Sequence, residues 1–163
     1  MEVNGKDYAL LSLLGKGKGG YSWLVEKEGK RYVLKEIHHE PCDYYTFGNK
    51  IESERRDYGL LRAAGIRVPE MLDIDTEQER ILKEYIEGPT AMELVKEGTL
   101  PDWALVEAEK MAAFAMAAGL NIDYYPTNFI LRGGELWYID YECNPYNPKW
   151  DFENWGKAHW LGA

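Results

Sequence analysis

Cysteine is scarce in this sequence, and its two cysteines, Cys42 and Cys143, lie about a hundred residues apart. This spacing matches no metal-binding motif, so we expect two free thiols in a reducing compartment. An excess of basic residues is also missing, since the formal net charge is −9 and the pI is about 4.9. A nucleic-acid binder normally presents a basic face to the phosphates, so the charge argues against nucleic acid as a partner.

Long apolar runs, repeats and low-complexity segments are absent as well. No run approaches the ~20 residues that cross a bilayer. The N-terminus has no cationic stretch followed by an apolar one, as a secretory signal would. Hydrophobic residues nevertheless make up 45% of the 163 residues, which is enough for one domain with a substantial core. We therefore expect a cytoplasmic single domain over residues 1–163, with no membrane as partner.

The first half of the sequence is rich in predicted strands. Runs of aromatic, Val and Leu residues at 7–14, 21–28 and 30–37 are separated by glycine-containing turns, a pattern typical of β-strands. Residues 48–64 carry apolar side chains among charges at helical spacing. Two further strands are expected before residue 86.

The second half favours helices. Residues 101–118 begin with Pro-Asp and are rich in Ala, Met and Leu, which predicts the strongest helix of the chain. A shorter helix is expected after Thr90, which precedes Glu93 at capping-box spacing. A Gly-Gly pair predicts a hairpin turn within 130–140. We expect the aromatic tail to close a small core with Trp150, Trp155 and Trp160. The fold class is therefore α+β.

The stretch GKGKGG contains the pattern G-x-G-x-x-G at Gly15, Gly17 and Gly20. Alone it is weakly specific. A dinucleotide-binding fold needs a helix directly after the loop and an acidic residue about twenty positions on. Here a strand follows, and Lys35 lies twenty positions after Gly15, which argues against an NAD-dependent oxidoreductase. A lysine on the next strand is typical of loops that cover ATP phosphates. The alternative is a flexible hairpin with a surface lysine.

Two acidic motifs follow in the second half. In NIDYYPTN, Asp123 lies five residues before Asn128, and Asp140 ends the strand-like run LWYID twelve residues further on. In phosphoryl transfer such an Asp orients or deprotonates a hydroxyl, while an Asn and a second Asp hold Mg²⁺. Each motif could separately be a polar turn. Their occurrence in this order, after a glycine loop and a lysine, favours phosphate chemistry.

With ILKEYIEG at 81–88 and YIDYE at 138–142, these motifs make the whole chain resemble the protein-kinase-like superfamily. It is most similar to the small atypical branches, namely RIO-type protein kinases, aminoglycoside phosphotransferases and choline kinases. The resemblance implies a protein-kinase-like fold with a β-rich N-terminal lobe over 1–86 and a truncated, helical C-terminal lobe over 87–163.

The resemblance also implies a nucleotide site. Lys35 would contact the ATP phosphates beneath the glycine loop. Glu54, eleven residues before the stretch GIRVP, would hold that lysine in place, with Glu52 as the alternative on the same predicted helix. The carbonyl of Glu84 and the backbone of Ile86 would meet the edge of the adenine.

Asp123 would be the catalytic base, and Asn128 and Asp140 the ligands of Mg²⁺. The implied function is an ATP- and Mg²⁺-dependent kinase that transfers the γ-phosphate to a hydroxyl, with protein Ser/Thr as the favoured acceptor. A small-molecule kinase is the alternative. A nucleotide-binding pseudokinase that acts as a regulatory module is a hypothesis of another class.

The sequence departs from the family pattern in four places. Asn121 replaces the His two residues before the catalytic Asp, and Lys83 stands where kinases place an apolar gatekeeper. Tyr141 and Glu142 replace Phe-Gly after the metal-binding Asp. Only 23 residues follow Asp140, so a peptide-binding platform is not expected. A partner chain, or a protein acceptor with its own surface, could complete the lobe.

Overall fold

The computed structural model describes residues 1–17, 19–38 and 49–162. Cys42 therefore lies outside the described residues. Contacts divide the chain into two compact units: unit 1 comprises Met1–Arg55 and Pro69–Tyr85, and unit 2 comprises Arg56–Val68 and Ile86–Ala163. Both units contain helical and extended segments, so the predicted α+β class is confirmed.

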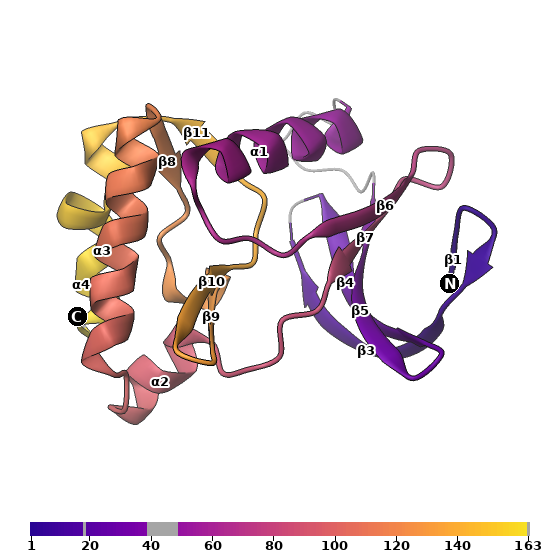
Figure 1. The fold of residues 1–163 in the computed structure, drawn as a ribbon, viewed down its shortest axis with the longest axis horizontal. Coiled ribbons are helices and arrows are strands. Elements are labelled where there is room, and N and C mark those ends of the chain that lie inside the picture. The colour runs from indigo at the N-terminus through magenta and orange to yellow at the C-terminus, as the bar shows by residue number, and fades with distance from the viewer. Residues whose placement is uncertain (18, 39–48, 163) are drawn as a thin grey trace. The chain divides into compact units, whose positions relative to one another are not determined.

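Unit 1 is built on a five-stranded antiparallel sheet (Figure 1) with the strand order β3-β4-β5-β7-β6. The strands are β3 (Ala9–Lys16), β4 (Gly20–Lys27), β5 (Lys30–Ile37), β6 (Met71–Asp75) and β7 (Arg80–Glu84). A short hairpin precedes them, with β1 (Glu2–Val3) and β2 (Lys6–Asp7). The strands expected in this half of the chain are confirmed.

Alternation along the strands gives the sheet of unit 1 two apolar faces. One core cluster consists of Val3, Tyr8, Val25, Leu34 and Leu82. The second cluster joins Ile37 and Ile81 to Ile51 of helix α1 (Lys50–Ala64). Lys35 is two residues from Ile37 and is the ladder partner of Ile81. Paired residues share a face, so Lys35 lies on the face that carries α1.

Unit 2 combines helices with short strands. Its elements are α2 (Ala91–Glu97), α3 (Asp102–Ala117), β8 (Leu120–Ile122), β9 (Phe129–Arg132), β10 (Glu135–Tyr138), β11 (Cys143–Pro145) and α4 (Lys157–Trp160). Three short helical segments complete it: the 3-10 helices η1 (Pro126–Asn128) and η2 (Pro148–Trp150) and the π-helical segment η3 (Phe152–Gly156). The capping box is confirmed, because the Thr90 side chain accepts from the Glu93 N–H and the Glu93 side chain from the Thr90 N–H. The predicted β9–β10 hairpin is also confirmed.

The tail differs in part from expectation. Trp160 is buried, but Trp150 is 48% exposed, so the expectation that all three tail tryptophans close the core is wrong for Trp150. A pairing that the sequence did not predict joins β8 to β11, with Ile122 opposite Cys143. Cys143 is a buried free thiol. Burial, followed by the nearby Asp57 carboxylate, raises the pKa of Cys143 to about 12.

No helix in the described part of the chain is both long and apolar enough to span a bilayer.

Candidate active site

The glycine segment connects β3 to β4 in unit 1, and its three glycines have different surroundings. The N–H of Gly17 donates to the carbonyl of Gly20 across 2.9 Å, which closes the turn. Among the described residues, a Cβ on Gly15 would meet nothing within 4 Å, and one on Gly17 only the Gly20 carbonyl at 4.0 Å. A Cβ on Gly20 would lie 2.8 Å from the Glu36 carbonyl. No described residue therefore crowds Gly15 or Gly17, whereas Gly20 is required by the packing of β4 on β5.

Lys35 and Glu54 form an ion pair within unit 1. The ammonium of Lys35, on β5, contacts Oε1 of Glu54, on α1. The two side chains are only 18% and 9% exposed. Oε2 of Glu54 is buried and has no hydrogen-bond partner among the described residues. The ammonium is therefore held beside the sheet by the largely buried Glu54 carboxylate.

The two residues predicted to contact adenine, Glu84 and Ile86, belong to different units. Glu84 ends β7 in unit 1, where its N–H donates to the Glu70 carbonyl across 2.9 Å. Its Oε1 accepts the Glu70 N–H across 3.1 Å. Ile86 belongs to unit 2 and is 2% exposed. Lys83 is buried, at 7% exposure. The adenine contacts of Glu84 and Ile86 remain predictions.

In unit 2, Asp123 follows β8 and is held by a network of hydrogen bonds. Its N–H donates to the hydroxyl of Tyr138 across 3.1 Å, and that hydroxyl donates to the Glu142 carbonyl across 2.7 Å. Oδ1 of Asp123 accepts the Tyr125 N–H across 3.1 Å. Nδ2 of Asn128 donates to the Asp123 carbonyl across 3.4 Å. The Asp and the Asn of the motif are therefore in direct contact.

The β9–β10 hairpin brings Asp140 to the same part of unit 2. Tyr138 pairs with Phe129, and the Ile139 N–H donates to the Asn128 carbonyl across 2.9 Å. Burial raises the pKa of Tyr138 well above its ordinary value, and the charge of Asp140 raises it further. Asn128 and Asp140 thus flank the end of one two-stranded ladder.

The donor chemistry of these two residues fits Mg²⁺. Magnesium prefers oxygen ligands and is usually bound by one or two carboxylates together with substrate phosphates. Asp140 offers a carboxylate, and an Asn128 amide that donates through Nδ2 presents its Oδ1 for a cation. Within the described residues no group of three or more His, Cys, Asp or Glu side chains could hold a metal ion. Magnesium held by Asp140 and Asn128 could take further ligands from nucleotide phosphates and water, as is usual for this ion.

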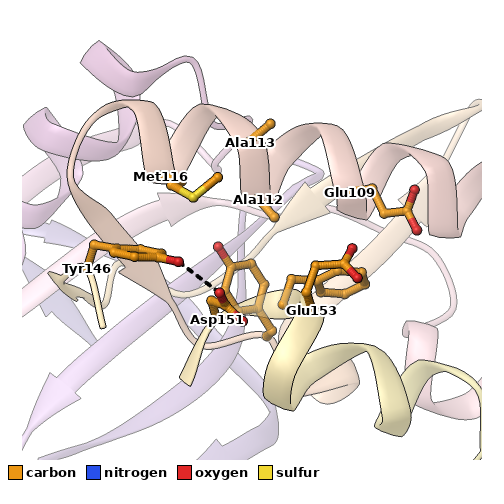
Figure 2. Close-up of a pocket in the computed structure, with 9 residues that line it drawn as sticks. Glu109, Ala112, Ala113, Met116, Tyr146, Asp151 and Glu153 are labelled. Atoms are coloured by element: carbon orange, nitrogen blue, oxygen red, sulfur yellow. Dashed lines mark hydrogen bonds between the residues drawn. The ribbon is translucent and has the colours of Figure 1, made fainter. Parts of the chain in front are cut away.

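A cavity of about 190 Å³ lies elsewhere in unit 2 (Figure 2). Its lining comprises Glu109, Ala112, Ala113, Met116, Tyr124, Tyr146, Asp151, Phe152 and Glu153. The acidic side chains of this lining already have partners. The Tyr146 hydroxyl donates to Asp151 across 2.8 Å, and Lys157 lies 3.0 Å from Glu109 and 3.8 Å from Glu153. We assign no ligand to this cavity.

Two contributions to this region were missed from the sequence. Tyr138 lies two residues before Asp140, and only the strand alternation of LWYID hints that it points inward. Trp160 donates from Nε1 to the carbonyl of Tyr124, the residue after Asp123, across 2.8 Å. No sequence pattern links residues this far apart.

Comparison with known proteins confirms the resemblance to the protein-kinase-like superfamily. The chain is 31% identical over 124 residues to the KEOPS complex subunit Bud32 of Pyrococcus abyssi (strain GE5 / Orsay). The aligned region covers 71% of this chain and 52% of the relative. The chain therefore spans about half the length of that protein, of which it is a distant homologue. No family model matches the sequence.

Proposed function

We propose that the chain has a protein-kinase-like fold and is an ATP- and Mg²⁺-dependent phosphotransferase. The observation that carries this proposal is the Lys35–Glu54 ion pair, which joins the third strand of the five-stranded sheet to the first helix. Protein kinases use this combination of a strand lysine and a helix glutamate to hold ATP phosphates. Distant homology to Bud32 supports the same class.

In the proposed mechanism, residues of unit 1 bind the nucleotide. The Lys35 ammonium neutralises the α and β phosphates, and Glu54 fixes its position. Gly15 and Gly17 let the backbone approach the phosphates, since glycine adds no Cβ between them, and Gly20 lets β4 pack closely on β5 beside them. The Glu84 carbonyl would accept a hydrogen bond from the adenine edge.

Residues of unit 2 carry the transfer in this proposal. Asp123 orients the acceptor hydroxyl and takes its proton as the oxygen attacks the γ-phosphorus. Asn128 and Asp140 would hold Mg²⁺, which neutralises phosphate charge when it is bound with ATP. The Ile86 backbone completes the adenine contacts, and ADP leaves with the bridging oxygen.

A protein Ser/Thr hydroxyl is the acceptor that we favour, with a small molecule as the alternative. The cavity in Figure 2 is not lined by Asp123, so we do not assign it to the acceptor. Helix α3 exposes four large apolar side chains, Trp103, Val106, Phe114 and Met116, and a partner chain docked on this helix would cover them. Bud32 is itself named as a complex subunit. A cytoplasmic location is part of this proposal.

Nucleotide binding provides the test. ATP with Mg²⁺ at about 100 times its Kd should stabilise the protein by about 2.7 kcal/mol, measured as a rise in the thermal unfolding midpoint. Lys35→Met should abolish the rise, while Lys30→Met, an exposed lysine on the same strand, should keep it. Stabilisation by NAD in place of ATP, or a full ATP effect in Lys35→Met, would refute the proposal. Binding without turnover would instead support the regulatory module.

A further inference from the structure

The segment Phe152–Trp160 of unit 2 packs directly on the residue that follows Asp123. Trp160 and Tyr124 are each 2% exposed. The Trp160 Nε1–H donates to the Tyr124 carbonyl across 2.8 Å in a buried hydrogen bond. The ring of Phe152 lies 5.5 Å from the ring of Tyr124 in an edge-to-face arrangement. The segment Phe152–Trp160 thus fixes both the backbone and the side chain of Tyr124.

Gly156 makes this approach possible. A Cβ on Gly156 would lie 2.6 Å from the Cβ of Tyr124 and 3.1 Å from the Phe152 ring. The backbone of Gly156 is helical, with φ −69°, so its conformation does not require glycine. Glycine is required at this position because the space between η3 and Tyr124 is too small for a Cβ atom.

Tyr125 is held by the same segment. Its ring lies 5.2 Å from that of His159 and 6.5 Å from that of Trp155. Its N–H donates to Oδ1 of Asp123. A displacement of Tyr124 or Tyr125 would therefore be transmitted to the Asp123 carboxylate through one peptide unit and one hydrogen bond.

We propose that the segment Phe152–Trp160 sets the position of the Asp123 carboxylate, with Gly156 and Trp160 as positioning residues. The inference rests on the proposed function, in which Asp123 is the base. Transfer requires reacting groups to be placed within about 0.5 Å, and a misplacement of about 1 Å can cost a hundredfold in rate. The hydroxyl of Tyr138 holds the Asp123 N–H, and the tail fixes the next two residues.

Turnover kinetics of Gly156→Ala and Trp160→Phe provide the first test. We expect kcat to fall by about ten- to a hundredfold, with KM for ATP within about twofold of wild type. Gly59→Ala and Leu161→Ala should keep the wild-type kcat, because a Cβ on Gly59 meets no atom within 4 Å in the part of the chain that the structure describes, and Leu161 is 63% exposed.

A double-mutant cycle separates positioning from general destabilisation. If the tail acts through Asp123, adding Gly156→Ala to Asp123→Asn should cause no further loss of kcat. If kcat of the double variant falls by the product of the two single-variant factors, the proposal is overturned. A fall in kcat in Gly59→Ala as large as that in Gly156→Ala would also overturn it.

The amide NMR spectrum gives a readout that does not depend on turnover. In Gly156→Ala, the signals of Asp123 and Tyr125 should shift, while those of β3–β5 should stay in place. If wild type transfers no phosphate but these two signals move, the proposed function fails and the positioning contact stands. Unmoved Asp123 and Tyr125 signals would overturn the contact. Trp160→Phe, a milder change, serves the same comparison if Gly156→Ala does not fold.

Discussion

Asp75 ends β6, and hydrogen bonds from two neighbouring residues fix its carboxylate. The Asn4 N–H lies 2.9 Å from Oδ2, and the Gln78 N–H lies 3.0 Å from Oδ1. These bonds, that from Asn4 first, hold the pKa of Asp75 below its ordinary value. The ionised carboxylate therefore links the N-terminal hairpin to the β6–β7 turn, and protonation would weaken these hydrogen bonds.

The low pKa of Asp75 predicts an acid-dependent loss of stability. The folded state binds fewer protons here than the unfolded state, whose Asp has a pKa of about 3.9. The free energy of unfolding should therefore decline as the pH falls below about 4. In Asp75→Asn, which cannot titrate, the decline should be smaller, whereas Glu77→Gln, an exposed residue of the same turn, should keep it. Urea unfolding between about pH 6 and pH 3 measures this, and an unchanged decline in Asp75→Asn would contradict it.

Single residues could be predicted where a motif implies a contact. The spacing to GIRVP predicts Glu54 as the partner of Lys35, and the structure pairs these two side chains. The hydroxyl of Tyr138 could not be predicted in this way, because its contact with Asp123 depends on the β9–β10 register and the path of β8. Short-range patterns do not specify such long-range geometry.

At the scale of elements, the glycines where β3 is followed by β4 have different surroundings. A Cβ on Gly20 would meet the Glu36 carbonyl at 2.8 Å and Cε of Lys35 at 3.2 Å, whereas one on Gly15 would meet no described residue within 4 Å. Gly20 therefore serves the packing of the sheet. Gly15 is not required by any contact of the described residues, so its proposed role is in ligand approach.

This difference predicts opposite outcomes for two alanine substitutions. Gly20→Ala should lower the free energy of unfolding by about 1–3 kcal/mol, because the added methyl overpacks β5. Gly15→Ala should change it by less than about 0.5 kcal/mol yet weaken ATP binding, since the methyl occupies the space that the phosphates need. Urea unfolding and ATP titration of both variants check this. Equal stability of the two, or unaltered ATP affinity in Gly15→Ala, would count against the account.

Elements with strong local signals could be predicted, and those defined by distant pairing could not. The α2 cap and the β9–β10 turn follow from Thr90-x-x-Glu93 and Gly133-Gly134. The β8–β11 pair involves three residues on each strand, separated along the chain by the whole β9–β10 hairpin. Its formation depends on tertiary packing. The β8–β11 pairing ends at Ile122 and so fixes the position of the loop that starts with Asp123.

At the scale of the whole molecule, the residues proposed for the reaction are divided between the two units. Unit 1 holds the Lys35–Glu54 pair, and unit 2 holds Asp123, Asn128 and Asp140. The sequence could predict the class of protein because the order of these motifs is specific. It could not predict the acceptor, because acceptor choice depends on surface shape and on partners outside the motifs.

The most direct measurement of the central claim is the rate of ADP formation from ATP and Mg²⁺, followed by ³¹P NMR with water or the protein itself as acceptor. We predict turnover by wild type and a loss of at least about a hundredfold in Asp123→Asn, since a general base contributes about 10²–10⁴ in rate. Asp102→Asn, an exposed aspartate at the start of α3, should retain the wild-type rate. Wild-type turnover in Asp123→Asn, or no ADP from wild type with ATP bound, would contradict the account.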